Sequence, residues 1–536
     1  ASIVINCSAM RLFLALLALS LHSSASYKIL VYNSKFGHSH SNFLGQIADI
    51  LAEEGHNVTS LLPIADPGVR DCTEKSTKIH VQQDPEVKKI YDVDAHSQVN
   101  FFEMNIAHPI APLFVGPMFA DIFSLTCKRV MEEPGLIERL RDEKYDVMIG
   151  ENFDVCGVGL SKAIAPKSLI GVSTSCIFGW QFDEWGVPSA LSYRPTSLLT
   201  SFDVHSFFAR LNNIYGDFLG RFMFWFSRRS VNRVLQEKYG PDYPSVAEQS
   251  SNVAFVFTNS EPLIESAAPT MSRVIDIGGI GAKKPKKLDQ YWEGILTLRP
   301  KTILLSFGSI AKSIIIPPAS KKGLLRTIAR FPDVTFIWKY EDLKDEFATG
   351  EASKLQNLVM TEWMPQVDIL AHPNLAAFMT HGGMGSTHET ALRGVPGIFI
   401  PLFADQPRNA GMMEFNGFGR VFDKYQIHDD EKLAEVISDV LGNEKYRENA
   451  KKISSMLSKK PFKSRELLIK HVEFAAQFGP SSALRPQSID MSFIEYNNID
   501  IIVLLLFGIA IFAYLFAIIL KSLARKDLKT SKTKTD

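Results

Sequence analysis

Residues 363–406 read WMPQVDILAHPNLAAFMTHGGMGSTHETALRGVPGIFIPLFADQ, and they join an apolar run, a glycine-rich turn and a helical pattern in immediate succession. AAFMT (376–380) is typical of a buried strand, HGGMG (381–385) predicts a tight turn, and STHETALR (386–393) predicts the start of a helix. Glycines let the backbone approach a ligand closely, and a helix N-terminus offers free amide donors at the positive end of the helix dipole. The turn therefore predicts a diphosphate cradle with His381 as a further donor, although a plain strand-to-helix connector is the alternative that the turn alone leaves open.

The residues around this turn suit the other parts of a nucleotide sugar. Trp363 offers an aromatic face for a flat base, and Gln366 offers an amide for a ribose. Glu389, inside the predicted helix, is suited to accept hydrogen bonds from ribose hydroxyls, and Asp405 and Gln406 are suited to the hydroxyls of a sugar. The segment thus contains residues suited to each part of a nucleotide sugar, namely its base, ribose, diphosphate and sugar.

Strands and helices alternate in two series, which a charged segment with the sequence AKKPKKLD (282–289) separates. A helix is predicted over residues 41–54, just after the first strand. The predicted strands of the first series are KILVYN (28–33), HNVTSLL (56–62), DVMIG (146–150), SLIGV (168–172) and AFVFT (254–258), and VIDIGGIG (274–281) ends this series. The predicted strands of the second series are TILLSFG (302–308), VTFIWK (334–339), AAFMT (376–380) and GIFI (397–400). The pattern predicts two doubly wound α/β domains that face each other and bind a ligand between them.

Composition and charge exclude several classes of function. The chain has 536 residues, too many for one compact core, and its 58 Lys and Arg balance its 58 Asp and Glu. This neutrality argues against nucleic acid as a partner. Five cysteines without a CxxC pair argue against a zinc ribbon or a redox motif. Without Cys7, four remain, and up to two disulfides in three connectivities are open, as is the alternative that some are buried free thiols.

Two apolar segments predict the compartment. Arg11 precedes a short apolar run, residues 12–21, and Ser24-Ala25-Ser26 suits cleavage before Tyr27, so a signal peptide is predicted. Residues 501–520 carry no charge and match the thickness of a bilayer. Six basic residues follow this run, and the positive-inside rule therefore places the tail in the cytosol and the bulk of the chain in the lumen.

The last residues and one internal stretch permit two interpretations each. The chain ends KTKTD (532–536), which is similar to a dilysine retrieval signal of endoplasmic-reticulum membrane proteins, although a merely solvated Lys-rich tail is the alternative. Residues 204–229 form an aromatic-rich amphipathic stretch. Such a stretch is more often core packing than a lipid or acceptor surface.

Taken together, Trp363-x-x-Gln366, His381-Gly-Gly, Glu389 and Asp405-Gln406 resemble the donor-binding signature of the UDP-glycosyltransferases, the superfamily that contains the membrane-anchored animal UDP-glucuronosyltransferases. The resemblance covers most of the chain and implies a GT-B fold, an α/β architecture of two Rossmann-like domains facing a cleft, followed here by a transmembrane helix.

The domain organisation expected from this resemblance places the acceptor in the first domain and the donor in the second. The expected segments are a signal peptide (1–26), an acceptor domain (27–285), a UDP-sugar domain (286–480), a juxtamembrane linker (481–500), the transmembrane helix (501–520) and a basic tail (521–536).

The resemblance extends to the phosphate contacts, with one departure. Ser306, Gly308 and Ser309 match a second phosphate-side loop of the family, and Gly383 belongs to the cradle. The family commonly has Asn where this chain has Gly385, and Ser386 and Thr387 are the residues expected to compensate.

Catalysis in the family is implied to be inverting, with a His that removes the proton of the acceptor hydroxyl. His40 has the expected spacing to Gly55-His56, and His38 is the alternative; without the donor signature both would be interpreted as polar loop residues. A His base needs a carboxylate to orient its ring. Glu151 follows the DVMIG strand where the family commonly has Asp, and Asp154 is the weaker candidate.

The expected reaction transfers glucuronic acid or glucose from UDP-glucuronic acid or UDP-glucose, as a co-substrate, to a hydroxyl of a small lipophilic acceptor at the endoplasmic-reticulum membrane. No cofactor and no metal are expected, because the metal-binding DxD pattern of other glycosyltransferases occurs only at residues 92–94, far along the chain from the cradle. Homo- or hetero-oligomer formation stays open. The alternative function is a non-catalytic nucleotide-sugar-binding membrane protein or partner subunit.

Overall fold

The structure of the protein is a computed structural model that describes residues 26–96, 100–105, 108–197, 202–308 and 311–532. The predicted signal peptide up to residue 25, Ser309 and the last four residues of the tail lie outside these ranges. The chain divides into two compact units, Ala1–Leu484 and Arg485–Asp536.

The first domain contains a seven-stranded parallel sheet with the order β3-β2-β1-β4-β5-β6-β7. Its strands are β1 (Lys28–Tyr32), β2 (Asn57–Pro63), β3 (Thr77–Val81), β4 (Val147–Glu151), β5 (Ser168–Ser173), β6 (Phe255–Thr258) and β7 (Val274–Asp276). Alternate residues of each central strand enter different cores: Leu30 of β1 packs on one side of the sheet and Ile29 on the other. Because both faces are covered by helices, these strands read as continuous apolar runs.

The helices that follow the strands cover the two faces of this sheet unequally. One face is covered by α3 (Pro85–His96), α4 (Ala111–Glu132), α5 (Leu136–Asp142), α6 (Cys156–Gly159), α7 (Ser161–Ile164), α8 (Gly179–Trp185), α9 (Phe207–Tyr239) and α10 (Val246–Ser251). The other face is covered by α2 (His38–Glu53) and by α19 (Ser464–Phe478), which comes from far along the chain.

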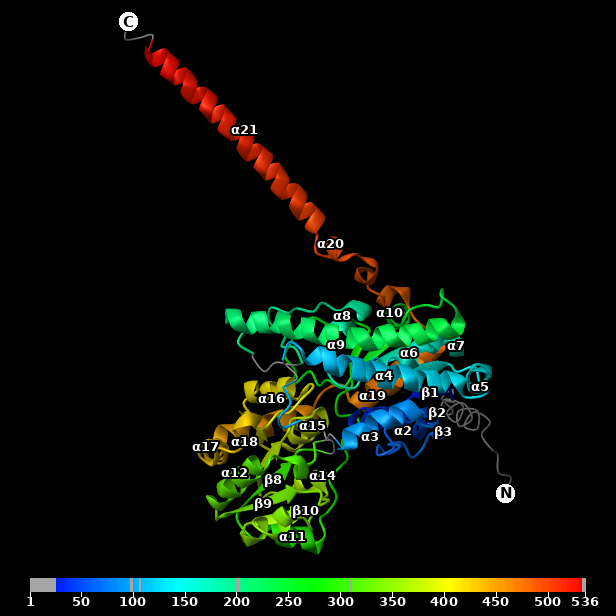
Figure 1. Cartoon of the computed structure of the whole chain (residues 1–536), viewed down its shortest axis with the longest axis vertical. Coiled ribbons are helices and arrows are strands. Elements are labelled where there is room, and N and C mark those ends of the chain that lie inside the picture. The colour runs from blue at the N-terminus through cyan, green and yellow to red at the C-terminus, as the bar shows by residue number, and fades with distance from the viewer. Residues whose placement is uncertain (1–25, 97–99, 106–107, 198–201, 309–310, 533–536) are drawn as a thin grey trace, which may run out of the picture. The chain divides into compact units, whose positions relative to one another are not determined.

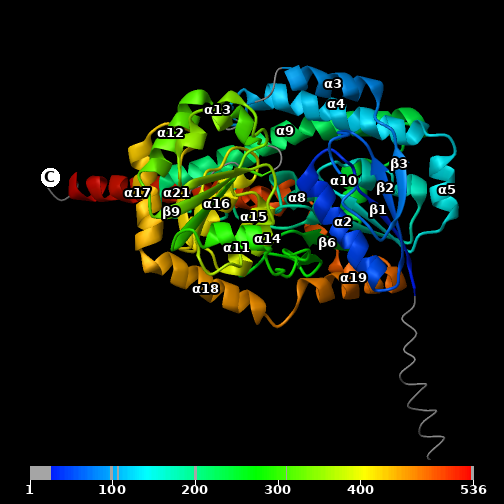
Figure 2. The ribbon, with the colours of Figure 1, turned by 90° about the horizontal axis from the view of Figure 1, so that it is seen from below.

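The second domain contains a six-stranded parallel sheet with the order β10-β9-β8-β11-β12-β13, which is the Rossmann order. Its strands are β8 (Lys301–Ser306), β9 (Val334–Lys339), β10 (Leu358–Thr361), β11 (Leu375–Thr380), β12 (Gly397–Phe399) and β13 (Gly419–Val421). Its helices are α11 (Gln290–Leu296), α12 (Pro318–Ala329), α13 (Glu346–Thr349), α14 (Gln366–Ile369), α15 (Met384–Arg393), α16 (Gln406–Phe415), α17 (Asp430–Gly442) and α18 (Glu444–Ser458) (Figure 2). The two sheets confirm the predicted pair of doubly wound α/β domains.

Several predicted boundaries were wrong, and each error has a physical reason. The edge strands β3, β10 and β13 were not predicted, because they are short and only partly buried or carry polar residues. The first helix begins at His38 rather than at residue 41, so both candidate histidines lie in a helical turn. The cradle helix begins at Met384, which shortens the predicted HGGMG turn and places Gly385 inside the first helical turn.

Helix α19 returns to the first domain after the chain has completed the second. Leu468 and Val472 of α19 are fully buried, and the helix packs against β4, β5, β6 and β7. This helix therefore extends the core of the first sheet, although its residues fall within the range (286–480) predicted for the UDP-sugar domain. The segment 282–289, which was predicted as a linker, has no regular secondary structure, and residues 282–287 of it are exposed.

Helix α9 combines the two interpretations of its aromatic-rich sequence. Its inner face, with Phe224, Val231 and Leu235, is buried, and the helix packs along α4 (Figures 1 and 2). Its outer face exposes Phe207 and Phe218, among other apolar side chains. The stretch is thus core on one side and an exposed apolar surface on the other.

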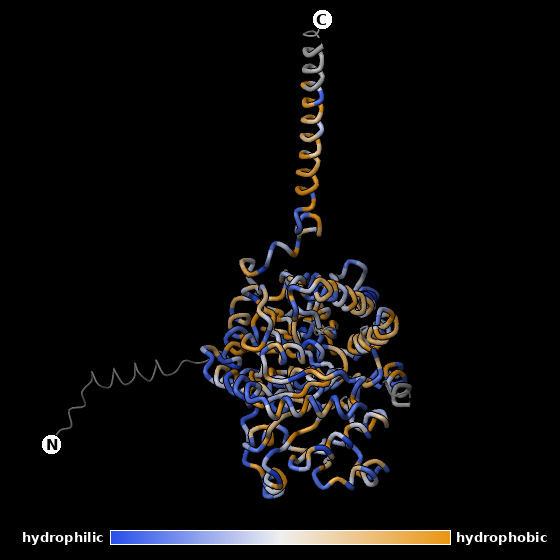
Figure 3. The backbone as a smooth tube through the Cα atoms, turned by 90° about the vertical axis from the view of Figure 1, so that its left-hand side faces the viewer, coloured by the Kyte–Doolittle hydropathy of each residue, from blue (hydrophilic) through white to orange (hydrophobic). Residues whose placement is uncertain are grey.

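The second unit contains α20 (Phe493–Tyr496) and α21 (Ile499–Lys532). Within α21, Ile499–Leu523 is long and apolar enough to cross a membrane, and its side chains are exposed. Figure 3 shows this helix as hydrophobic along most of that length. The helix is a candidate membrane anchor that contains the predicted span of residues 501–520.

One disulfide joins Cys127 of α4 to Cys156 of α6, and Cys72 and Cys176 are free thiols. Among the open pairings of the four cysteines that the structure describes, there are thus one bridge and two unpaired thiols. The bridge ties α6 to α4. Helix α6 begins shortly after the end of β4, where the candidate orienting carboxylate, Glu151, lies.

Replacing both Cys127 and Cys156 with Ser should lower the stability of the first domain by about 2–4 kcal/mol, because the open chain gains conformational entropy when unfolded. The measurement is the urea midpoint, with Cys72→Ser as the matched control that should leave it nearly unchanged. Alkylation of the denatured, unreduced protein should modify Cys72 and Cys176 and spare the bridged pair. Modification of all four thiols would contradict this pairing.

Candidate active site

The candidate catalytic residues lie where the strand order of the first sheet reverses, between β1 and β4. The chain leaves β1 toward β2 and later returns to β4 on the other side of β1, so β1 and β4 are neighbours with helices on opposite faces. His40 lies in the first turn of α2, directly after β1, and Glu151 is the last residue of β4. Open α/β sheets bind ligands beyond the carboxyl ends of their strands at such a point.

His40 forms a hydrogen-bonded cluster with the buried residues Glu151 and Thr174. Nδ1 of His40 lies 2.5 Å from Oε1 of Glu151, and the Thr174 hydroxyl donates to the same carboxylate oxygen at 2.6 Å. Burial opposes the charge on His40, but the Glu151 carboxylate, together with the charges of Asp405 and Asp154, outweighs this effect, so the pKa of His40 is raised above its ordinary value of 6.5. A ring whose Nδ1–H is held by a carboxylate presents Nε2 as its free basic nitrogen.

The two weaker candidates occupy different surroundings. No described hydrogen bond joins His38 to Glu151, and burial lowers the pKa of His38. Asp154 is buried and accepts from the backbone N–H of Cys156 at 3.1 Å, and burial raises its pKa to about 6. Asp154 acts on His40 only through space. The structure therefore brings His40 and Glu151 together and leaves His38 and Asp154 outside the cluster.

Aromatic side chains line the space beside His40. The ring centroids of Phe36 and Phe153 lie 4.6 and 4.9 Å from that of His40. Phe153 in turn contacts Phe178 and Trp180, with centroid separations of 5.9 and 6.4 Å. The candidate base thus adjoins an apolar wall that suits a hydrophobic molecule with a hydroxyl at one end.

The predicted cradle lies at the corresponding point of the second sheet, where β8 and β11 are neighbours. Ser306 ends β8 and is followed by Gly308 with φ of 89°, while His381 follows β11 and precedes Gly382 with φ of 78°. A Cβ added at Gly308 would lie 2.7 Å from Cε1 of His381, so only glycine permits this approach. Burial lowers the pKa of His381 to about 4, and the ring is therefore a neutral donor near pH 7.

Helix α15 presents its N-terminus without a side-chain cap. Gly383 is the N-cap residue, no side chain accepts from the first amides, and the first turn contains no acidic residue. Gly385 is exposed, and a Cβ added there would meet open space, so the position has room for the Asn that the family commonly carries. Thr387 is buried and its hydroxyl donates to the Gly383 carbonyl at 3.1 Å, so of the two compensating residues only Ser386 stays available.

The residues predicted to bind base and ribose lie beside this helix. The Trp363 side chain is 72% exposed, which is unusual for Trp and suits a stacking platform. Gln366 begins α14, and its Nε2 donates to Oε2 of Glu389 at 2.6 Å. Burial raises the pKa of Glu389. The structure thus brings the predicted ribose residues into direct contact.

Asp405 and Gln406 follow β12, and they have different roles in the loop. Asp405 accepts from Nδ2 of Asn409 at 3.0 Å and follows Ala404, whose φ of 55° is in the left-handed region. The Gln406 side-chain oxygen accepts from the backbone N–H groups of Leu402 and Phe403 at 2.9 and 3.2 Å. Only the amide N–H₂ of Gln406 is therefore free for a sugar hydroxyl, since its oxygen already shapes the loop.

Two consecutive residues that sequence reasoning missed connect the domains. Thr174 belongs to the His40–Glu151 cluster, and the hydroxyl of the adjacent Ser175 donates to Oδ2 of Asp405 in the second domain. Asp405 also acts electrostatically on His40. The sequence did contain a signal for them: these polar residues directly follow the apolar SLIGV run, and they therefore lie at the carboxyl end of a central strand.

Lys339 was also missed. It is the last residue of β9, and its Nζ donates to the carbonyl of Gly308 at 2.6 Å. Its charge acts on His38 and His381 and lowers the pKa of each. The sequence signal was a single charged residue at the end of the VTFIWK run, and the structure makes it a cation beside the cradle.

Comparison with known sequences agrees with this geometry. A family model described as "UDP-glucoronosyl and UDP-glucosyl transferase" matches residues 27–534. The chain is 30% identical to "Putative UDP-glucuronosyltransferase ugt-47" of Caenorhabditis briggsae over 499 residues, which covers 92% of each protein. It is 26% identical to "UDP-glucuronosyltransferase 1A7" of Rattus norvegicus, with 87% of this chain and 86% of that protein covered.

Solved structures share the fold at low sequence identity. The glycotransferase of kitacinnamycin matches with a TM-score of 0.55 and 16% identity over 84% of this chain and 99% of its own. Phytolacca americana UGT2, solved with UDP-2fluoro-glucose and pterostilbene, matches with a TM-score of 0.56 and 16% identity over 84% of this chain and 100% of its own. These matches show a GT-B architecture. The chain belongs to the UDP-glucuronosyl and UDP-glucosyl transferase family and is a GT-B glycosyltransferase with a candidate C-terminal membrane anchor.

Proposed function

We propose that this glycosyltransferase moves glucuronic acid or glucose from its UDP conjugate to a hydroxyl of a small lipophilic acceptor, with inversion at the anomeric carbon and with His40 as the general base. The observation that supports this most directly is the pair of neighbours Thr174 and Ser175. One binds the His40–Glu151 pair, and the other binds Asp405 beside the donor cradle. Consecutive Cα atoms lie about 3.8 Å apart, so a sugar bound at Asp405 would lie close to the imidazole.

In the proposed step, the acceptor hydroxyl donates its proton to Nε2 of His40 while its oxygen attacks the anomeric carbon. Glu151 holds Nδ1–H and stabilises the imidazolium that forms. The bond between the anomeric carbon and the phosphate oxygen breaks as the new bond forms, and UDP leaves with the electron pair. A single displacement of this kind inverts the configuration of the sugar.

The donor is held by the second domain in this proposal. Trp363 stacks on the uracil, Gln366 and Glu389 bind the ribose, and Asp405 and Gln406 bind the sugar. The amides at the start of α15, together with Ser306, Ser309, Gly308, Gly383, Gly385, Ser386 and His381, contact the diphosphate. Donors aimed at developing charge stabilise a leaving group without reorganisation, and this is usually the largest catalytic contribution.

The proposed location follows from the two terminal segments. The positive charges after the candidate anchor favour a cytosolic tail and a lumenal catalytic part. The proposed compartment is the endoplasmic-reticulum membrane, where lipophilic acceptors dissolve close to the anchored enzyme.

Replacing His40 with Ala should lower kcat by about 10²–10⁴-fold, because the general base is lost. UDP binding, measured by calorimetry, should stay unchanged, since the donor residues belong to the second domain. His38→Ala is the matched control and should retain turnover. Full turnover in the His40 variant would contradict the assignment, and UDP binding without transfer by the wild type would favour the non-catalytic binder.

The pH profile should report the raised pKa of His40. A base must be neutral to accept a proton, so kcat/KM should fall as the pH drops through a pKa above 6.5. Glu151→Gln removes the charge that raises this pKa, and the acid limb should therefore move to lower pH while the maximal rate decreases. The measurement is kcat/KM between about pH 5 and pH 9. An acid limb at the same pH in both proteins would exclude Glu151 as the orienting group.

Replacing Trp363 with Ala should weaken UDP binding by about 10- to 100-fold, because an aromatic platform for one base contributes about 1–3 kcal/mol. The thermal midpoint should barely change, since the side chain is 72% exposed. Tyr291→Ala, at a residue that is 61% exposed, is the matched control. Equal UDP affinity in the Trp363 variant and the wild type would place the base elsewhere.

A further inference from the structure

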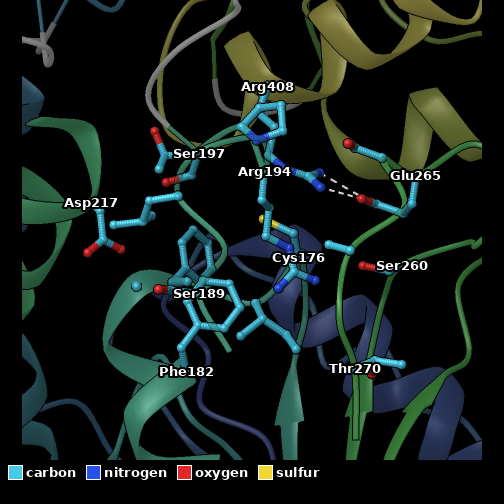
Figure 4. Close-up of a pocket in the computed structure, with 18 of the residues that line it drawn as sticks. Cys176, Phe182, Ser189, Arg194, Ser197, Asp217, Ser260, Glu265, Thr270 and Arg408 are labelled. Atoms are coloured by element: carbon cyan, nitrogen blue, oxygen red, sulfur yellow. Dashed lines mark hydrogen bonds and ion pairs between the residues drawn. The ribbon is translucent and has the colours of Figure 1, made fainter. Parts of the chain in front are cut away.

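A cavity of about 320 Å³ adjoins the candidate active site (Figure 4). Its lining includes Cys176, the residue after Ser175 of the Ser175–Asp405 contact. Phe178, Trp180 and Phe182 form part of its wall. Almost all of its lining comes from the first domain, and Arg408 is the contribution of the second. None of the roles assigned to the donor or to the base uses this cavity.

Arg194 is one of the charged residues that line the cavity. Its guanidinium lies over the ring of Phe182, 4.7 Å from the centroid. Its Nη1 is buried and has no hydrogen-bond partner among the described residues, and no described carboxylate forms an ion pair with it. Burial lowers the pKa of Arg194, and the charges of Glu265 and Asp276, which are not in contact with it, only partly oppose this effect. A partly buried cation without a contacting anion is costly, so the position is suited to an anionic ligand.

The other charged groups of the cavity have partners within the protein. Arg408 forms an ion pair with Glu265, drawn as dashed lines in Figure 4. Asp276 accepts from the Thr258 hydroxyl at 2.5 Å, and burial raises its pKa to about 6.

Asp217 is the remaining carboxylate of the lining. One of its oxygens accepts from Nε of Arg221 at 2.6 Å, and the other has no hydrogen-bond partner among the described side chains. Figure 4 shows Asp217 on the opposite side of the view from Glu265, with Arg194 between them. Arg194 is therefore the cation of this cavity that the described protein leaves without a contacting anion.

An aromatic path connects the cavity to the candidate base. The centroids of His40 and Phe153 are 4.9 Å apart, and Phe153 contacts both Phe178 and Trp180. Phe178 and Trp180 stack on each other at 4.9 Å and form part of the cavity wall. A molecule with a hydroxyl at His40 and an apolar body along these rings would thus extend toward Arg194.

We propose that the cavity binds a carboxylate of the acceptor through Arg194, and that the preferred acceptors are lipophilic hydroxy acids. The inference rests on the proposed function, because it takes His40 as the site of the reacting hydroxyl. Arg forms two parallel hydrogen bonds with a carboxylate, and the guanidinium of Arg194 lies over the ring of Phe182. The C6 carboxylate of a uronic acid donor has the same chemistry, and the experiment separates the two sources.

The experiment compares phenols that carry carboxyalkyl chains of increasing length with their methyl esters. At the best chain length, the wild type should use the acid with a kcat/KM about 10- to 100-fold above that of the ester, the range expected for hydrogen bonds to a charged group. Arg194→Met should abolish this ratio, and Arg194→Lys, which retains charge without the planar fork, should retain part of it. Arg229→Met, which removes an arginine stacked on Trp225 at 5.2 Å on the outer face of α9, should leave the ratio unchanged. Equal use of acid and ester by the wild type would overturn the inference while leaving the proposed function intact.

A second arm tests the donor. With a methyl ester as acceptor, the ratio of kcat/KM for UDP-glucuronate to that for UDP-glucose should be the same in the wild type and in Arg194→Met. Loss of a preference for UDP-glucuronate in the variant would assign Arg194 to the donor and overturn the acceptor assignment.

A third arm measures binding without turnover. The hydroxy acid should raise the thermal midpoint of the wild type and of His40→Ala, and not that of Arg194→Met, because the carboxylate is held independently of the base. If no acceptor is glycosylated and this pattern still holds, the proposed function fails and the carboxylate site stands. If the acid shifts all three proteins equally, the site is wrong.

Discussion

The hydrogen bond between Nδ1 of His40 and Oε1 of Glu151 is the interaction on which the catalytic account depends. It joins the helix after β1 to the end of β4, two segments more than a hundred residues apart that only the parallel sheet brings together. The bond fixes the ring, selects its free nitrogen and raises its pKa against the effect of burial. Thr174 donates to the same oxygen, and it thereby limits the positions that the carboxylate can adopt.

The second domain likewise places its histidine at the ends of two neighbouring central strands, but the pKa of that histidine is lowered rather than raised. The neighbours β8 and β11 place Ser306 and His381 at one sheet edge, as β1 and β4 place His40 and Glu151. His381 has no carboxylate in hydrogen-bond contact among the described residues, and burial therefore lowers its pKa to about 4. One histidine is thus suited to take a proton, while the other is suited to donate a hydrogen bond to an anion without carrying charge.

The proximity of the proposed donor residues could be predicted from sequence because these residues lie in one continuous segment. Trp363, Gln366 and Glu389 belong to neighbouring elements, so local spacing determines their proximity. The acceptor side depends on contacts between distant strands, and Thr174 and Ser175 gave only a weak local signal. Helix α19, the Cys127–Cys156 bridge and the cavity at Arg194 likewise arise from long-range packing that periodicity does not encode.

The configuration of the product at the anomeric carbon tests the central claim most directly. UDP-sugar donors carry the sugar in the α configuration, and direct attack by a hydroxyl activated at His40, opposite the diphosphate, gives a β-linked product. The measurement is the coupling constant of the anomeric proton in the NMR spectrum of the purified product. A large coupling, diagnostic of the β-glucoside or β-glucuronide, is the predicted result, and an α-linked product would contradict a single displacement by a base on the first domain.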